Sequence, residues 1–259
     1  MAKYTLIIRP QPDADRDASW LQRYHVPALA SPVMYASPIT QKPDIAALMP
    51  SAMMFSGVIF TSRHALDGMI QVGGLNEWRD KPAFTVGKAT AAAARQAGFS
   101  RVITGNGGGN GLIQPIRDYL AGKYTNPDQA ALFWPSARDI SFDMGGALAA
   151  FNIPVTRVPV YQMLPADGLS PAVIAALSSG EIGAVIAMSA RSINLLCDAL
   201  MNISSAKAMA GIKLIAGSEG IARAAGTGWR EVFVAKSPRR SRLLAIAVLL
   251  NSRMQQNGE

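Results

Sequence analysis

Apolar and polar positions alternate in blocks along this chain, and residues 84–98, FTVGKATAAAARQAG, show the pattern most clearly. A short apolar run ends at Gly87, a polar turn follows, and an alanine-rich segment from about Thr90 stops at Gly98. The pattern predicts a buried strand, a glycine turn and the first turn of a helix. The unpaired N–H groups and the dipole at such a helix start attract anions.

The same pattern recurs in the second half of the chain, at residues 214–226, LIAGSEGIARAAG. The units before the two glycine turns also match, because residues 58–62 (VIFTS) and 185–189 (VIAMS) each lead into a helix that starts near an arginine. A pair of strand–turn–helix units that occurs once in each half predicts two similar α/β domains.

The other segments continue this alternation of strands and helices. We expect an irregular edge strand within 26–34 and further strands at 4–8, 58–60, 83–86, 102–104, 130–134, 155–161, 184–188, 213–216 and 231–234. We expect helices at 12–23, 45–49, 63–72, 90–97, 112–120, 142–151, 171–178, 192–201, 219–225 and 242–250, with a frayed tail from Asn251. Such alternation predicts parallel sheets covered by helices on both faces.

The strand count predicts how the chain divides into domains. After residue 164 only about three strands remain, and a complete sheet there needs the N-terminal strand at residues 4–8. We therefore predict a discontinuous domain of residues 1–37 with 164–259 and an inserted domain of residues 38–163. Segments near 34–40 and 158–163 would then cross between the two domains.

The composition indicates a globular protein of a reducing compartment. Of 259 residues, 49% are apolar and 16% charged, which excludes a disordered chain. A single cysteine, Cys197, cannot form a disulfide within the chain, which favours the cytoplasm. The N-terminal apolar run is too short for a signal peptide, and the longest run, 243–250, is too short to span a bilayer. We expect no membrane association.

The net charge of +8 favours an anionic partner, which could be nucleic acid, acidic lipid or a polyanionic small molecule. The basic residues are scattered, and the one clear cluster is Arg239, Arg240 and Arg242 in SPRRSR. No aromatic residues are interleaved with basic ones as in single-strand binders, so we do not expect nucleic acid.

Sequence motifs for metal or cofactor binding are missing. Two histidines and one cysteine give no ligand set with metal spacing, so we expect no metal and no cofactor. The glycine loop at 105–111, GNGGGNG, lacks the lysine of a phosphate-binding loop. We interpret it as a flexible turn whose amides could secondarily meet a carboxylate. His64 could face a site, although a surface histidine in the first turn of a helix is the commoner case.

Several polar residues occupy the ends of predicted strands. Thr61, Ser62, Thr90 and Ser189 each open onto a helix, where a hydroxyl is either an N-cap or a carboxylate ligand. Four such positions on two domains could hold a ligand with many carboxylates. Arg9 and Arg63 are guanidiniums at strand ends, for which simple solvation is the alternative.

Taken in order, these motifs resemble the uroporphyrinogen-III synthase family. They are IIRP, FTS before a helix, VGKATAAAARQAGF, VPVYQ, MSARS and IAGSEGIARAAG, and together they span nearly the whole chain. The resemblance implies two similar α/β domains joined by a two-stranded β linker, with the active site in the interdomain cleft. It also implies a lyase of heme biosynthesis. This enzyme cyclises hydroxymethylbilane with loss of water to uroporphyrinogen III and inverts ring D, without metal or cofactor.

The resemblance also implies roles for individual residues. Tyr161 in VPVYQ matches the family's tyrosine and is the predicted catalytic hydroxyl donor. Lys213 matches a lysine before the second glycine turn, although it could equally be a solvated strand-edge lysine. The predicted substrate-binding set is Arg9, Thr61, Ser62, Arg63, Thr90, Ser189, Lys213, Gly217 and Gly220.

One position departs from the family pattern. Gly220 stands where the family usually has threonine, and Glu219 adds a negative charge beside it. A non-catalytic two-domain binding module of hinge type, or a degenerate synthase homologue, therefore stays open for an acidic small molecule. For the synthase we expect a monomer that makes transient contact with hydroxymethylbilane synthase.

Overall fold

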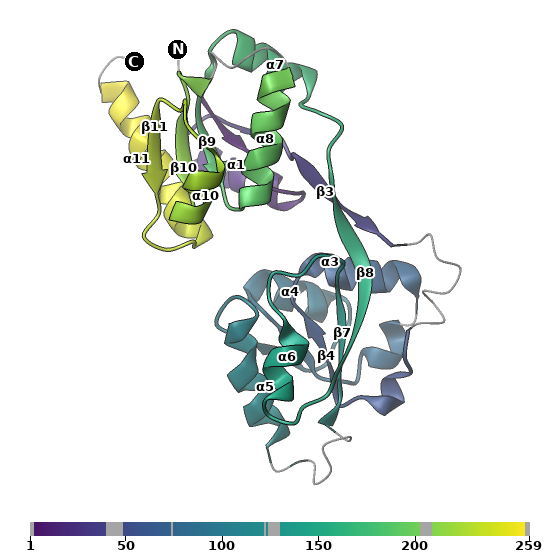
Figure 1. The fold of residues 1–259 in the computed structure, drawn as a ribbon. Coiled ribbons are helices and arrows are strands. Elements are labelled where there is room, and N and C mark those ends of the chain that lie inside the picture. Colours follow the sequence, from purple (N-terminus) through teal and green to yellow (C-terminus); the bar gives the residue numbers. More distant parts are fainter. Residues whose placement is uncertain are drawn as a thin grey trace. The chain divides into compact units, whose positions relative to one another are not determined.

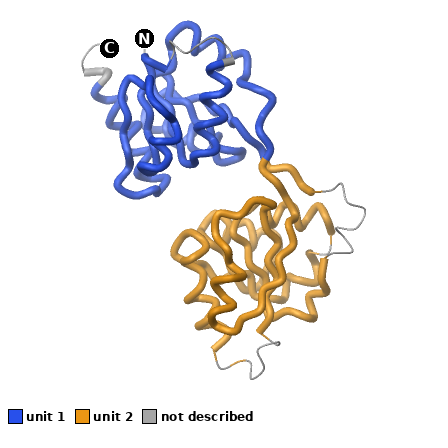
Figure 2. Tube along the Cα trace, viewed as in Figure 1, with its two compact units in different colours: residues 1–35, 164–259 blue, residues 36–163 orange. Residues whose placement is uncertain are grey.

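The computed structural model describes residues 3–39, 49–73, 75–121, 123, 130–202 and 209–256. Two compact units make up the chain (Figures 1 and 2). Unit 1 comprises residues 1–35 and 164–259, and unit 2 comprises residues 36–163. The helix predicted at 45–49 falls almost entirely on residues outside the described part.

Unit 1 contains a five-stranded sheet in the order β11-β10-β9-β1-β2, and its neighbouring strands pair in parallel. The strands are β1 (Tyr4–Ile7), β2 (Ala28–Ala30), β9 (Ile182–Ala187), β10 (Lys213–Ala216) and β11 (Glu231–Val234). The strand β1 comes from the N-terminal segment and lies between β2 and β9. Both segments of unit 1 are therefore needed to complete its sheet.

Helices cover both faces of this sheet. They are α1 (Asp13–Arg23), α7 (Pro171–Ser178), α8 (Ala190–Asn202), α10 (Glu219–Ala224) and α11 (Arg240–Gln256). Leu6 packs into the core with α7, α8 and α10, whereas the next residue, Ile7, packs into the core with α1 and α11. Because successive side chains of a strand point to opposite faces, strands buried on both faces become continuous apolar runs.

Unit 2 contains a six-stranded sheet in the order β3-β8-β7-β4-β5-β6. The strands are β3 (Met34–Pro38), β4 (Gly57–Phe60), β5 (Ala83–Thr85), β6 (Val102–Thr104), β7 (Leu132–Ala137) and β8 (Val155–Pro165). The pairings from β8 through β6 are parallel. The strands β3 and β8 are hydrogen-bonded neighbours, and each crosses a boundary between the units.

The helices of unit 2 also lie on both faces of their sheet. They are α3 (Arg63–Val72), α4 (Lys88–Gln96), α5 (Ile113–Leu120) and α6 (Met144–Ala149), with short 3-10 turns η1 (Ala52–Met54), η2 (Leu75–Trp78) and η3 (Asn110–Leu112). Phe60 joins the core formed with α3 and α4, and Ile59 joins the core formed with α5 and α6. The predicted parallel α/β architecture is confirmed.

The strand order identifies where a ligand would bind in each unit. In unit 2 the chain runs from β4 to β5 and β6 on one side and returns to β7 on the other. In unit 1 the same reversal lies between β1 and β9. Open parallel sheets bind ligands beyond the carboxyl ends of the strands that flank such a reversal.

Several predicted helix boundaries are wrong by two residues or more, including both ends of α6 and the starts of α4, α8 and α11. The helix α4 begins at Lys88, with Gly87 as its N-cap, so Thr90 lies inside its first turn. The helix α11 continues to Gln256 through the tail expected to fray from Asn251. Asn251 is 6% exposed, and its amide donates to the carbonyl of His25 at 3.3 Å, which holds the added turns on the core.

Candidate functional site

The hydroxyl of Tyr161 lies near the carboxyl end of the unit 2 sheet, beside the start of α3. The side chain is 7% exposed, and its ring packs into the core with residues of α3. Burial raises the pKa of the phenol, and a hydrogen bond with the Ser62 hydroxyl partly opposes that rise. The phenol therefore stays protonated at neutral pH and can donate a proton.

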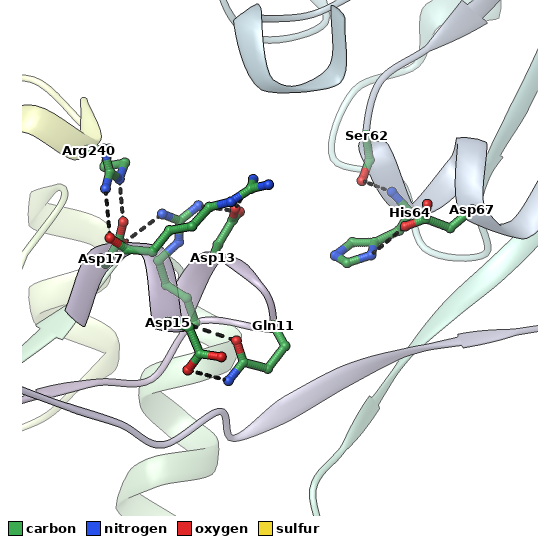
Figure 3. Close-up of polar contacts among 10 residues, drawn as sticks. Gln11, Asp13, Asp15, Asp17, Ser62, His64, Asp67 and Arg240 are labelled. Atoms are coloured by element: carbon green, nitrogen blue, oxygen red, sulfur yellow. Dashed lines mark hydrogen bonds and ion pairs between the residues drawn. The ribbon is translucent and has the colours of Figure 1, made fainter. Parts of the chain in front are cut away.

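Ser62 has two partners at once. Its backbone is extended, and its Oγ accepts from the N–H of His64 at 3.1 Å, which caps α3 (Figure 3). The same hydroxyl lies beside Tyr161 and, against the effect of burial, lowers the pKa of its phenol. From the sequence, the Ser62 hydroxyl could either cap a helix or face the site. In the structure it caps α3 and also lies beside Tyr161.

The helix α3 approaches β8 closely because Gly68 faces the strand. A Cβ added at Gly68 would come within 2.9 Å of the carbonyl oxygen of Val160, the residue before Tyr161. The His64 ring lies 5.7 Å from the Tyr161 ring, measured between centroids. His64 Nδ1 lies 3.9 Å from Asp67 Oδ2 (Figure 3). With a side chain only 20% exposed, His64 is more buried than its position in the sequence suggested.

Two pockets of unit 2 share Tyr161 as a lining residue. One, of about 310 Å³, is also lined by His64, Asp67 and Gln71. The other, of about 180 Å³, is lined by Thr61 after β4, by Trp134 of β7 and by residues 139–142 of the following loop. This second pocket therefore lies at the reversal of strand order in unit 2.

The walls of the smaller pocket are fixed by long side chains. Thr61 Oγ1 accepts from the indole N–H of Trp134 at 3.3 Å. Arg157 of β8 donates to Ser136 Oγ at 2.9 Å and to the carbonyls of Ala137 and Arg138 at 2.9 and 2.6 Å. Trp134 and Arg157 were not among the predicted site residues, because neither belongs to a motif.

The first glycine turn is open at its N-cap. Among the residues that the structure describes, a Cβ added at Gly87 would meet nothing within 4 Å, and Gly87 itself has no side chain to cap the first turn of α4. Thr90 is buried in that first turn and does not lie at a strand end. In the glycine loop, Gly107 and Gly108 have φ values of +95° and +68°, which favour glycine. Gly108 and Gly109 line the smaller pocket.

The second glycine turn is capped by its own side chain. Ser218 Oγ accepts from the N–H of Ile221 at 3.4 Å, and Glu219 places a carboxylate in the first turn of α10. Gly217 follows β10, and Gly220 is exposed in this first turn. The two glycine turns look equivalent in sequence, but their helix caps differ.

Ser189 also caps a helix. Its Oγ accepts from the N–H of Ser192 at 3.1 Å and lies 2.7 Å from the Ser192 hydroxyl. Ser189 and Gly217 both follow strands of the unit 1 sheet and lie at its carboxyl edge. The structure therefore brings these two predicted residues to one edge.

Arg9 and Lys213 both make ion pairs within unit 1. Arg9 follows β1 and donates to Asp13 and Asp17, both at 2.8 Å. Lys213 is the first residue of β10, and its Nζ lies 3.4 Å from a carboxylate oxygen of Glu231. Lys213 is therefore at the amino edge of the sheet, away from Ser189 and Gly217.

In unit 2 the structure groups Thr61, Ser62 and Arg63 around the start of α3, with Tyr161 beside Ser62. A site shared between the two units, as the resemblance implies, stays a prediction. Within the described ranges, no three His, Cys, Asp or Glu side chains gather in a group that could hold a metal. Among the helices of the described part of the chain, none is long and apolar enough to cross a membrane.

Comparisons with known proteins agree with this fold. Two solved uroporphyrinogen III synthases have similar structures. A mutant enzyme from the extremely thermophilic bacterium Thermus thermophilus is 15% identical over all of both chains, with a TM-score of 0.54. The enzyme from Helicobacter pylori is 13% identical, covers 96% of this chain and 99% of its own, and has a TM-score of 0.59. At these identities the likeness shows the fold.

Two sequence comparisons were informative about the family in different ways. Comparison with individual curated proteins found no match. The family model described as uroporphyrinogen-III synthase HemD matches residues 16–245, which is most of the chain. The chain therefore belongs to the uroporphyrinogen-III synthase HemD family.

Proposed function

We propose that Tyr161 is the proton donor in the ring closure of hydroxymethylbilane to uroporphyrinogen III. As a member of its family, the chain is a cyclising lyase of tetrapyrrole biosynthesis with hydroxymethylbilane as its substrate. The assignment of Tyr161 rests on one observation. Its side chain lies beside Ser62 and lines the pocket at the reversal of strand order in unit 2, and burial raises the pKa of its phenol.

The reaction needs positioning more than a strong catalytic group. The electron-rich pyrroles of the substrate expel the terminal hydroxyl and leave an azafulvene cation. The substituted carbon of ring D attacks this cation, and the resulting spiro intermediate fragments and recloses with ring D inverted. The protein must hold the two ends of a flexible chain together, which is a proximity effect.

Tyr161 assists the first step. Its phenol donates a proton to the departing hydroxyl, so that water leaves, and Ser62 can donate a hydrogen bond to the phenolate that forms. A proton lost from the substrate in ring closure restores the phenol. The raised pKa suits this role, because the group must be protonated when the substrate binds.

The carboxylates of the substrate would be held by hydroxyls and helix N–H groups. In unit 2 we assign this role to Thr61, Ser62, Arg63 and the first turn of α4. In unit 1 we assign it to Ser189, and we leave out the amides after Gly217 because Ser218 and Glu219 already occupy the start of α10. We leave Lys213 out, because it lies at the amino edge of its sheet and pairs with Glu231. We further propose a cytoplasmic monomer that receives its substrate from hydroxymethylbilane synthase.

A coupled assay tests this function. Hydroxymethylbilane is generated in place, and the products are oxidised and separated as type I and type III isomers. Spontaneous closure gives type I, so we expect type III to predominate only when the protein is present. Tight binding of a porphyrin polycarboxylate with only type I product would instead identify a binding module.

A further inference from the structure

The carboxyl edge of unit 1 carries a cluster of guanidiniums that the proposed reaction does not use. We define the arginine cluster as Arg9, Arg239, Arg240 and Arg242. Arg9 follows β1, and the other three form the N-cap and first turn of α11. The helices α1 and α11 pack on the same face of the sheet, which brings these two chain segments together.

A buried carboxylate organises this cluster. Asp17 of α1 is 1% exposed and accepts from Arg9 Nη1 at 2.8 Å. It also accepts from Arg240 Nε on its other oxygen (Figure 3). Arg240 also donates to the carbonyl of Arg16 at 3.4 Å. One buried carboxylate thus fixes two guanidiniums from opposite ends of the chain. The Arg240 side chain remains 42% exposed.

The arginines at the start of α11 carry the wrong sign of charge to stabilise that helix. The first turn of α11 contains no acidic residue, whereas Arg240 and Arg242 lie in it and Arg239 precedes it. A helix N-terminus carries a partial positive charge, which favours acidic side chains and opposes basic ones. Both Arg239 and Arg242 are exposed to solvent. Arginines at the start of a helix act against the stability of that helix. Where such residues lie at the edge of a sheet that binds ligands, we expect them to have a function.

We propose that the arginine cluster binds carboxylates of the tetrapyrrole substrate, with Asp17 as the residue that positions Arg9 and Arg240. This proposal rests on the proposed function, which supplies a ligand with eight carboxylates. Guanidinium pairs well with carboxylate because its paired N–H donors match the two oxygens. Because the cluster has four cations and one buried counter-charge in Asp17, with Asp13 beside Arg9, it keeps an excess of positive charge.

The test compares two double variants that remove equal charge from unit 1. The first is R239Q/R242Q in the arginine cluster. The matched control is R223Q/R253Q, which removes exposed arginines from the last turns of α10 and α11. Both full-length proteins are assayed for kcat, KM and product isomers. Binding of uroporphyrin III, an oxidised octacarboxylate, is measured by fluorescence without turnover.

We expect R239Q/R242Q to raise KM and the Kd for uroporphyrin III about three- to tenfold, with the isomer ratio unchanged. Its binding should also depend less on salt. Its Tm should stay the same or rise, because unfavourable charges leave a helix start. The control should keep its KM and lose a little Tm, because it removes favourable charges from helix ends. A residue with only a structural role would not combine weaker binding with retained stability.

The outcomes separate this proposal from the proposed function. If KM and Kd change equally in both double variants, or change in neither, the arginine cluster does not bind the substrate's carboxylates. The proposed synthase function would be unaffected by that result. A wild-type protein that gives no type III product but loses porphyrin affinity in R239Q/R242Q would support the cluster and refute the synthase. If R239Q/R242Q weakens binding of a DNA oligonucleotide or of phosphatidylglycerol vesicles but not of uroporphyrin III, the carboxylate assignment is wrong.

Discussion

The two glycine turns look alike in sequence and differ in what their helix starts can bind. Gly87 offers no side chain to cap α4, and in the described part of the chain the space beside this glycine is open. At the second turn Ser218 caps α10, and Glu219 follows in the first turn. Unpaired helix N–H groups bind anions, whereas a serine cap satisfies one of them and a carboxylate repels a second anion. The comparison indicates that α4 is the better carboxylate site.

The two sheets show a related contrast at their carboxyl edges. In unit 2 the hydroxyls nearest the proton donor have neutral neighbours, Ser62 beside Tyr161 and Trp134 beside Thr61, although Arg157 also bonds to Ser136 at this edge. In unit 1 the edge holds Asp17 with two arginines. A proton donor keeps its proton more readily among neutral neighbours, whereas a surface that holds carboxylates needs positive charge. We therefore assign proton transfer to unit 2 and charge recognition to both units.

The largest expected effect concerns which part of the chain folds alone. A fragment of residues 38–162 contains β4 to β7 and most of β8, so we expect it to unfold cooperatively on heating. A fragment of residues 164–259 lacks β1, which pairs with β9 and supplies Leu6 and Ile7 to both cores of unit 1. We expect this second fragment not to fold. Calorimetry and circular dichroism would show both results, and a cooperative transition in fragment 164–259 would refute the idea of a discontinuous domain.

The second effect is the loss of the buried carboxylate in unit 1. Asp17→Asn leaves two guanidiniums without their shared counter-charge, and breaking a buried ion pair costs about 3–5 kcal/mol. Asp15→Asn is the matched control, because Asp15 is an exposed residue of α1 that pairs with Gln11. We expect that control to change the free energy of unfolding by less than about 0.5 kcal/mol. Urea unfolding monitored by circular dichroism measures both, and equal stability of the two variants would contradict the positioning role of Asp17.

Much of the fold could be predicted from the sequence because its strands are buried on both faces. Leu214 and Ile215 pack into opposite cores, so β10 is a continuous apolar run that the pattern identifies. The largest error came where a distant contact decides a boundary. Asn251 extends α11 by bonding to the carbonyl of His25, which lies far away in the sequence. Periodicity carries no information about such a pairing.

The site could be predicted only in part, for the same reason. Ser62 and Tyr161 belong to motifs, and the structure brings them together. Arg9 was expected to meet the substrate, but its partner Asp17 also binds Arg240, which lies 223 residues further along the chain. Trp134 lies in an apolar strand with no mark of a role, and its indole orients Thr61 only because β7 lies beside β4.

The third effect tests the neutral edge of unit 2. Tyr161→Phe keeps the ring in the core and removes the donor, and general-acid help is usually worth about 10²- to 10⁴-fold. Because the substrate also closes unaided, we expect about a 10- to 100-fold loss in kcat and a larger share of type I isomer. KM should change little, since one neutral hydrogen bond contributes about 1 kcal/mol. The coupled assay with isomer separation measures all three.

Tyr119→Phe is the control for this substitution. Burial pushes the pKa of Tyr119 up, but hydrogen bonds from Arg101 and Lys123 outweigh it and lower the pKa. The two tyrosines therefore titrate in different ranges.

Since the pKa of Tyr161 is raised, its proton favours the folded state, and this contribution to stability is complete below about pH 10 and lost as pH rises further. Unchanged rate and isomer ratio in Tyr161→Phe, with a slower Ser62→Ala, would make Tyr161 a structural residue.

The fourth prediction adds a side-chain cap to the start of α4 and removes the one at the start of α10. Gly87→Asp fits the extended backbone and the open space, and its carboxylate should occupy the N–H groups of α4. We expect this variant to gain a few tenths of a kcal/mol in stability and to raise KM about threefold or more. Ser218→Gly should lose a few tenths of a kcal/mol and keep its KM. Thermal unfolding and steady-state kinetics measure the pair. If Ser218→Gly changes KM and Gly87→Asp does not, α10 is the binding helix.

The smallest effect concerns Gly220, where the family usually has threonine. Of the described residues outside the backbone of α10, a Cβ at this position would meet Ser218 Oγ alone, at 3.8 Å, so Gly220→Thr should fit without strain. Replacing glycine in a helix turn should stabilise α10 by about 0.5 kcal/mol. If α10 takes no part in binding because Ser218 and Glu219 already occupy its start, kcat/KM should stay within about twofold of wild type. A several-fold rise in kcat/KM on restoring the hydroxyl would show that α10 does meet the substrate. The contrast between the two glycine turns would then reflect a weakened second site, and Glu219→Gln should add to the gain by removing the repelling charge.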